Sequence, residues 1–331
     1  MSGIALGLRP IDNRNRVSDC RQVSTDRTKK LHLPSVLVVV VLCLCGCTTS
    51  PILVPASQTP GELPRSLAPY LEAGPGAVSV SARTLESGFG CTVAFEVYEP
   101  IRSAESDLAT VTVVLGHGFM SDLTRMRAWA ELWASHGVRT AVASFCNSSW
   151  VSGRHDRNAA DMIAVADLLL DAQGPQGAVI YAGFSAGGLS ALLAMDSDPR
   201  AVAYLGLDPV DSGGLAGGAQ NIEAPSLFLF GEPSSCNAAS NMEQFLPPTA
   251  VALRIPYATH CDFQNPYDMA CERFCGSVAP AGTAAAIRKT ILGLATAWIV
   301  GHALGGDAGS MPVDASLVDE LERAQRIARV Q

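Results

Sequence analysis

The hydrophobic positions of this chain form short runs that recur through the sequence and predict its strands. Residues 78–85 and 92–99 alternate apolar and polar side chains around a Gly-Phe-Gly turn, which predicts an antiparallel hairpin. The runs that follow are continuously apolar and are typical of strands buried on both faces of a parallel sheet. They comprise residues 110–115, 138–143, 178–182, 202–207, 226–230 and 250–255.

Helical patterns lie between these runs. Apolar residues at three- and four-residue spacing predict helices over residues 122–136, with Ser121 or Asp122 as the N-cap, and over residues 155–172. A long helix is predicted at about residues 281–304, and its charged side chains favour a core helix over a membrane span. A hairpin followed by repeated β–α units predicts an α/β fold with one mostly parallel central sheet and helices on both faces.

The N-terminal residues have the pattern of an export signal. Residues 1–30 are polar and basic, an apolar run follows at residues 31–45, and Leu-Cys-Gly-Cys occupies residues 44–47. This ending resembles the lipobox of bacterial lipoproteins, in which the residue that matches Cys47 is lipidated and becomes the mature N-terminus. The alternatives are a plain secretory signal or an uncleaved anchor.

The lipobox resemblance implies a signal peptide at residues 1–46 and a membrane-anchored lipoprotein of the bacterial cell envelope. No Asp follows Cys47, which favours the outer membrane. Six prolines among small residues predict an extended tether at residues 47–77, before a domain at residues 78–304. A C-terminal tail with a charged surface helix is expected at residues 305–331.

Charge argues against one class of partner. Seven of the 23 basic and three of the 31 acidic residues precede Cys47, so the remaining chain holds 16 basic and 28 acidic residues, a net charge of −12. An acidic body of this kind gives no support to nucleic-acid binding.

One motif joins a predicted strand to a predicted helix. The strand at residues 178–182 continues into Gly-Phe-Ser-Ala-Gly-Gly at residues 183–188 and then into an Ala- and Leu-rich helix. A Gly-x-Ser-x-Gly segment in this context resembles the nucleophile elbow of α/β-hydrolases. The nucleophile of an elbow sits in a strained turn, and residues without a Cβ let strand and helix pack closely around it. Ser185 is therefore the predicted nucleophile.

A second motif would supply groups that stabilise negative charge. Gly-His-Gly-Phe at residues 116–119 follows an apolar strand, like the loop that supplies one oxyanion-hole N–H in α/β-hydrolases. Attack on an ester places a negative charge on the carbonyl oxygen, and losing one N–H donor typically costs about 3 kcal/mol. We assign the two donors to the backbone of Phe119 and Ala186, and we predict that His117 braces the loop.

A serine hydroxyl needs a base to become a good nucleophile. Of the six histidines, His260 lies just after the last predicted strand of the sheet, where an α/β-hydrolase carries its base. The positions of the acidic residues do not decide which of them is the carboxylate partner of His260. The loop after residues 226–230 offers Glu232, whereas the preceding strand ends in Asp-Pro-Val-Asp, which offers Asp208 and Asp211, and Asp262 is a more remote candidate.

A family resemblance bears on that choice. The runs GFSAGG, GLDPVD, THCDF and Cys-x-x-x-Cys-Gly resemble chlorophyllases and their bacterial relatives, a dienelactone-hydrolase-like group of α/β-hydrolase serine esterases, over about residues 78–304. The resemblance implies that Asp208 is the triad acid. Phe184 and Ala186 replace the His and Arg of the chlorophyllase serine motif, so a chlorophyll ester substrate is not implied.

An even number of cysteines in an exported chain predicts disulfides. The six after Cys47 are Cys91, Cys146, Cys236, Cys261, Cys271 and Cys275, which allow 15 pairings. The second strand is expected to run antiparallel beside the fourth, which would make Cys91 and Cys146 neighbours.

The pairing of the remaining four cysteines is less directly predicted by the fold. Cys236 and Cys261 both lie on loops at the predicted catalytic edge and are expected to pair. This pairing leaves Cys271 with Cys275, one helical turn apart. We expect no metal, because that pair lacks the second ligand pair of a zinc site.

Together these residues predict an exported, lipid-anchored serine hydrolase that cleaves small-molecule or lipid carboxylic esters without a cofactor. The acyl-enzyme forms as His260 takes the proton of the serine. Lactone or peptide cleavage at the same residues is one alternative. The other is a catalytically inactive hydrolase-fold lipoprotein that binds a hydrophobic ligand or partner. Phe119, Phe184 and Trp150 are candidates for an apolar acyl pocket.

Overall fold

The computed structural model describes residues 60–101, 111–149, 152–171, 177–276, 279–305 and 313–330. The predicted signal with Cys47 lies outside the described residues, and so does Trp150. The chain divides into two units between Val54 and Pro55, and all described residues belong to the second unit.

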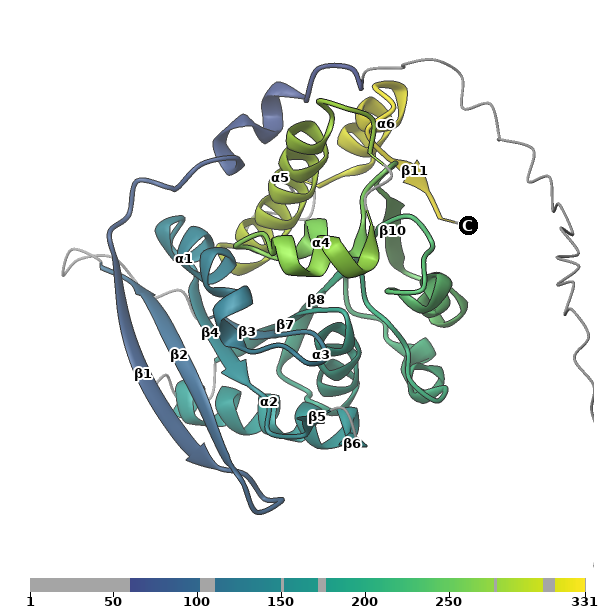
Figure 1. The fold of residues 1–331 in the computed structure, drawn as a ribbon. Helices are drawn as coiled ribbons and strands as arrows, with labels where there is room; N and C mark the ends of the chain where they lie inside the picture. The colour runs from purple at the N-terminus through teal and green to yellow at the C-terminus, as the bar shows by residue number, and fades with distance from the viewer. Residues whose placement is uncertain are drawn as a thin grey trace, which may run out of the picture. The chain divides into compact units, whose positions relative to one another are not determined.

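A nine-stranded sheet forms the centre, in the order β1-β2-β4-β3-β7-β8-β9-β10-β11 (Figure 1). The pairs from β4 through β3, β7, β8 and β9 to β10 are parallel, and β1–β2, β2–β4 and β10–β11 are antiparallel. The mostly parallel α/β sheet predicted above is therefore confirmed. Its strands are Val78–Glu86 (β1), Thr92–Pro100 (β2), Val111–Gly116 (β3), Arg139–Ser144 (β4), Ala178–Phe184 (β7), Ala201–Leu207 (β8), Ser226–Phe230 (β9), Ala250–Arg254 (β10) and Ala328–Arg329 (β11).

Helices cover both faces of this sheet (Figure 1). Successive residues of a strand point to opposite faces, and Ile180 and Tyr181 of β7 accordingly lie in two separate apolar cores. The first core contains α1 (Arg127–Ser135), α5 (Ala284–Ala303) and α6 (Ala315–Arg323), and the second contains α2 (His155–Leu170) and α3 (Ala186–Ser197).

Shorter elements complete the described part, mostly in the loops. They are η1 (Arg65–Tyr70), η2 (Leu123–Arg125), η4 (Leu215–Asn221), η5 (Ala238–Phe245), η6 (His260–Phe263), α4 (Met269–Cys275) and the two-stranded pair β5 (Ser148–Ser149) and β6 (Ser152–Gly153). The helix predicted at residues 122–136 is divided into η2 and α1. Asp122 is the N-cap of η2, where its carboxylate accepts the N–H of Thr124.

Residues 47–59 of the predicted tether lie outside the described residues, and the described remainder differs from the prediction. Residues 60–77 are packed on the domain instead of extended away from it. Leu67 of η1 is fully buried, and the N–H of Gly74 donates to Ser135 Oγ at 2.7 Å. The N–H of Gly61 donates to the carbonyl of Ala324 near the other end of the chain. Apolar contacts of Leu63, Leu67 and Tyr70 with the core, together with these backbone contacts, hold the proline-rich segment in place.

The C-terminal tail contains the predicted helix but is more than a surface element. Its described residues 313–330 include the amphipathic helix α6, whose Leu317, Val318 and Leu321 are buried, and β11, which adds a ninth strand beside β10. The tail is thus part of the core and of the sheet.

The last long helix, α5, packs as predicted for a core helix. Its length and composition would suffice to cross a membrane, but 61% of its most apolar window is buried inside the domain. Trp298 packs in this core and donates its indole N–H to the carbonyl of Tyr204 on β8 at 2.9 Å.

Candidate active site

The turn between β7 and α3 has the geometry expected of an elbow. Ser185 occupies it with φ 54° and ψ −125°, a conformation that L-residues adopt only when their surroundings enforce it. A Cβ at Gly183 would overlap the carbonyl of Gly187, and a Cβ at Gly187 would overlap the carbonyl of His117. These two glycines therefore let β7, α3 and the loop after β3 meet around the serine.

Three side chains from distant parts of the chain meet at the carboxyl ends of the parallel strands. Ser185 Oγ lies 2.9 Å from Nε2 of His260, and Nδ1 of the same imidazole lies 2.6 Å from Oδ2 of Asp208. Ser185 and His260 are each 7% exposed, and Asp208 is fully buried. The structure thus brings together the predicted nucleophile, base and acid in one hydrogen-bonded chain.

His260 is held by its own loop and by the elbow. It opens η6, where the N–H and hydroxyl of Thr259 donate to one oxygen of Asp262. The ring of Phe184 lies 4.6 Å from the imidazole, centroid to centroid. The histidine is therefore positioned independently of the hydrogen bonds it makes with its partners.

Asp208 has its own support. Its Oδ1 accepts the backbone N–H of Gly231 at 2.9 Å, which leaves Oδ2 directed at the imidazole. The amide of Asn237 lies 3.2 Å from Oδ2 and 3.4 Å from Oδ1. These donors stabilise the ionised carboxylate, because a charged acceptor gains most from hydrogen bonds inside a protein.

Asn237 is a site residue that the sequence did not identify. It is fully buried, its Nδ2 donates to the carbonyl of Glu232 at 2.9 Å, and its Oδ1 accepts the N–H of Ser234 at 2.8 Å. It therefore folds the loop after β9 against Asp208. No motif marks it, since an Asn in a loop is ordinary and its partner lies 29 residues away.

The alternative acids serve other purposes in the described residues. Glu232 accepts the backbone N–H of Tyr257 at 2.9 Å, and Asp211 accepts two backbone N–H groups at 2.7 and 2.8 Å around the start of η4. Each carboxylate thus supports a loop, and the geometry favours Asp208 as the partner of the imidazole.

The predicted oxyanion donors are available. Among the described residues, the backbone N–H groups of Phe119 and Ala186 have no hydrogen-bond acceptor. Ala186 begins α3, so its N–H also lies at the positive end of the helix dipole. Both residues line a pocket that includes Ser185.

His117 braces the loop that carries Phe119. Its Nε2 accepts the backbone N–H of Phe145 at 2.9 Å, so the ring proton resides on Nδ1, which donates to the carbonyl of Gly118 at 2.7 Å. Burial lowers the pKa of His117 and keeps the ring neutral. The contacts agree with its predicted role.

Two pockets adjoin Ser185. The larger, of about 640 Å³, contains His260 and has Phe119, Met120, Phe184 and Phe274 among its apolar residues. The smaller, of about 370 Å³, contains Ala186 together with the polar residues His155, Asp211, Ser212 and Ser235. Phe119 and Phe184 thus lie beside the nucleophile as expected of pocket residues.

The disulfides correct two predicted pairings. Cys91–Cys146 is present as predicted and joins the start of β2 to the end of β4. The pairs Cys236–Cys261 and Cys271–Cys275 were wrong, since Cys236 bonds Cys275 and Cys261 bonds Cys271.

Helix geometry explains why the pairing differs from the prediction. Residues four apart on a helix project side by side, so the two cysteines of α4 both point toward the site loops, one to each. Their sulfur atoms are 3.9 Å apart and unbonded. Cys261 and the two cysteines of α4 lie close enough together to bind a metal, but all three sulfurs are oxidised in disulfides, which removes the thiolates that a metal would require.

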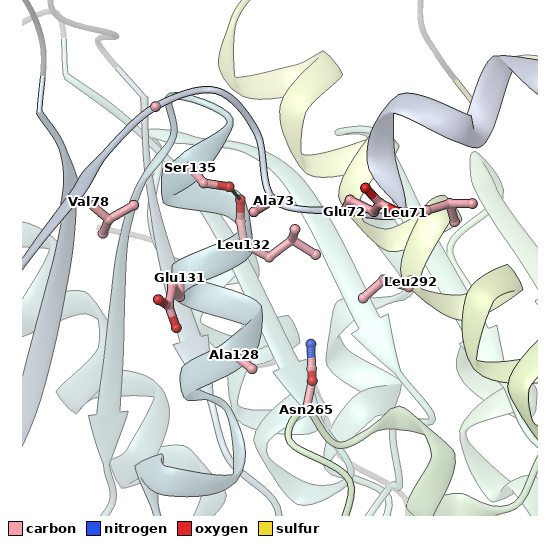
Figure 2. Close-up of a pocket in the computed structure, with 11 residues that line it drawn as sticks. Leu71, Glu72, Ala73, Val78, Ala128, Glu131, Leu132, Ser135, Asn265 and Leu292 are labelled. Atoms are coloured by element: carbon pink, nitrogen blue, oxygen red, sulfur yellow. Dashed lines mark hydrogen bonds between the residues drawn. The ribbon is translucent and has the colours of Figure 1, made fainter.

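A third pocket, of about 410 Å³, lies between α1, α5 and the segment after η1 (Figure 2). Glu72 and Glu131 lie along it, but its one serine, Ser135, accepts the N–H of Gly74 and donates to the carbonyl of Leu132. That hydroxyl has a structural use, and among the described residues no histidine or carboxylate hydrogen-bonds to it. The third pocket therefore lacks the chemistry found at Ser185.

The comparisons with known proteins leave the family open. The chain matches no protein-family model, and none of the curated proteins matches it. The contacts described above are therefore the basis for any assignment of function.

Proposed function

We propose that this protein is a serine hydrolase with the α/β-hydrolase fold that cleaves carboxylic esters through an acyl-enzyme. The observation that carries the proposal is the continuous hydrogen-bonded chain from Ser185 Oγ through His260 to Asp208. The conformation of the serine supports the same chemistry, and so do the backbone N–H groups of Phe119 and Ala186, which have no acceptor among the described residues.

The proposed reaction follows from these contacts. His260 Nε2 takes the hydroxyl proton as Ser185 Oγ bonds to the ester carbonyl carbon, and the carbonyl oxygen becomes an anion facing the N–H groups of Phe119 and Ala186. Asp208 stabilises the resulting imidazolium. The carbon–oxygen bond to the alcohol then breaks, and His260 returns the proton to the departing oxygen. Water, activated by the same imidazole, releases the acid and restores the serine.

The family and location remain part of the proposal. The resemblance to chlorophyllase relatives and dienelactone-hydrolase-like esterases fits the order of the serine, aspartate and histidine along the chain. The lipobox at Cys47 supports a lipid-anchored envelope protein. Three disulfides agree with an oxidising compartment, since such bonds are rare in reducing ones.

A catalytically inactive binding protein is the second candidate. A ligand-binding role would be supported by the apolar side chains of the larger pocket, of which Phe274 is 84% exposed. Binding alone does not require a serine, an imidazole and a carboxylate in series, so hydrolysis explains more of the site. Lactone or peptide cleavage would use the same residues.

The test is hydrolysis of p-nitrophenyl esters from acetate to palmitate by wild type and by Ser185→Ala. We expect the variant to lose at least about 10⁴-fold in kcat, as in serine hydrolases that lose the nucleophile. Ser79→Ala, on the exposed strand β1, is the matched control and should behave as wild type. Hydrolysis that survives in Ser185→Ala would exclude this serine as nucleophile, and an inactive wild type would favour the binding protein.

A further inference from the structure

The two pockets beside Ser185 differ in which part of an ester each can hold. This inference rests on the proposed function. His260 must deliver its proton to the departing alcohol oxygen, so the alcohol group has to lie on the side of the imidazole. Only the larger of the two pockets includes His260 among its lining residues, whereas the smaller includes Ala186, a proposed oxyanion donor. The acyl chain is thereby directed into the smaller pocket.

The smaller pocket contains a buried histidine that the reaction does not use. His155 opens α2, is 4% exposed and lines this pocket. Its Nδ1 is buried and has no hydrogen-bond partner among the described residues. Its Nε2 lies against Gly153, where an added Cβ would come within 3.0 Å of it and within 3.8 Å of the Phe119 ring. The imidazole edge therefore adjoins the wall formed by Gly153 and Phe119.

The charges around His155 narrow the chemistry of a ligand. Burial is the main influence on this imidazole and lowers its pKa, while Asp156 and Asp211 act weakly in the opposite direction. A neutral imidazole offers one donor and one acceptor. Asp211, in the same pocket, already accepts two backbone N–H groups, and its negative charge disfavours an anionic acyl group.

An unpaired polar group in a buried site discriminates strongly between ligands. An apolar acyl chain would leave the imidazole without a hydrogen bond, whereas a hydroxyl can both donate to it and accept from it. The volume of about 370 Å³ suits a short acyl chain, and the apolar residues lie mainly in the pocket on the alcohol side.

We propose that the smaller pocket is an acyl subsite in which His155 hydrogen-bonds a hydroxyl group of the acyl chain. The preferred substrates are therefore neutral esters of short hydroxy acids with apolar or aromatic alcohols. His155 is then a specificity-determining residue, separate from the residues that break the ester bond.

The experiment compares two p-nitrophenyl esters of nearly equal shape, 3-hydroxybutyrate and 3-methylbutyrate, which differ by a hydroxyl in place of a methyl. Wild type should favour the hydroxy ester by about tenfold in kcat/KM, the worth of roughly one net hydrogen bond. His155→Leu should abolish or invert that preference, and His155→Gln, which retains a donor and an acceptor, should restore part of it. Phe274→Ala, in the larger pocket, should leave the hydroxyl-to-methyl ratio unchanged.

The outcomes separate this inference from the proposed function. Equal kcat/KM for the two esters in wild type, with both activities lost in Ser185→Ala, would overturn the acyl subsite and leave the serine hydrolase intact. A wild type that cleaves neither ester would overturn both. Should His155→Leu not fold, equal inhibition of wild type by free 3-hydroxybutyrate and 3-methylbutyrate would count against the subsite.

Discussion

Two buried histidines lie in loops that follow parallel strands of the same sheet, and each uses both ring nitrogens. His117, after β3, bonds the N–H of Phe145 and the carbonyl of Gly118. His260, after β10, bonds a hydroxyl and a carboxylate. Burial and hydrogen bonding are alike in the two loops, so the difference lies in the chemistry of the partners.

That difference determines what each ring can do. Two backbone groups hold His117 in one tautomer and offer it no proton to move, so it can only join two loops. The partners of His260 include a group that can lose a proton and a carboxylate that stabilises the charged ring. A buried histidine after a strand is therefore not sufficient for catalysis.

After loss of the serine itself, the largest expected effect comes from removing the carboxylate beside His260. Asp208→Asn should lower kcat about 10³- to 10⁴-fold with little change in KM, because an amide favours the wrong tautomer of the imidazole. Glu232→Gln should cost less than about tenfold, since that carboxylate accepts the N–H of Tyr257 and, among the described residues, does not contact His260. Steady-state kinetics of both variants on one p-nitrophenyl ester decide between Asp208 and Glu232. Near-normal turnover in Asp208→Asn and collapse in Glu232→Gln would reverse the assignment.

Replacing His117, which braces the loop that carries Phe119, should affect stability more than catalysis. His117→Leu leaves the N–H of Phe145 without its acceptor, and we expect a loss of about 1–3 kcal/mol in the free energy of unfolding. Activity should fall far less than in Asp208→Asn, through misplacement of Phe119. Urea unfolding and kinetics measure the two effects. His117→Gln supplies an acceptor and should recover part of the stability, and a 10³-fold loss of kcat in a fully folded His117→Gln would contradict the brace.

A third histidine lacks strong partners and sharpens the comparison. His302 of α5 packs on Trp298, its Nε2 has no partner among the described residues, and burial lowers its pKa to about 4. The unfolded chain, with a pKa near 6.5, binds this proton more readily. The contribution of the neutral ring to stability is therefore complete above about pH 6.5 and is lost as the pH falls toward 4.

Chemical denaturation at pH 7 and pH 5 tests this smallest effect. Between pH 7 and pH 5, the free energy of unfolding of wild type should fall by about 1 kcal/mol more than that of His302→Leu. This figure is smaller than the pKa shift alone would give, because the ring is partly exposed to solvent. His117 and His155 titrate with the same sign in both proteins, so the difference isolates His302. Identical pH dependence in the two proteins would show that His302 is not desolvated as described.

Local pattern identified much of this molecule. Continuous apolar runs located the six parallel strands of the central sheet, β3, β4 and β7 to β10, to within one or two residues, because a strand buried on both faces tolerates few residues that are not apolar. The turn at Ser185 was equally recognisable, since its glycines are required by contacts within a few residues. His260 followed from its position after the last predicted strand, whereas the position of Asp208 left Glu232 and Asp211 as alternatives and the family resemblance favoured it.

What the sequence determined by itself is therefore the parallel strands and the long helices, the turn at Ser185 and the residues able to perform acid–base chemistry. Tertiary structure alone decided that Asn237 supports Asp208, that Cys236 bonds Cys275, and that residues 60–77 and the last strand join the domain. The physical reason is the separation along the chain of the residues that interact. Apolar periodicity and backbone strain act between neighbours in the chain, whereas these contacts depend on which loops the folded sheet brings together.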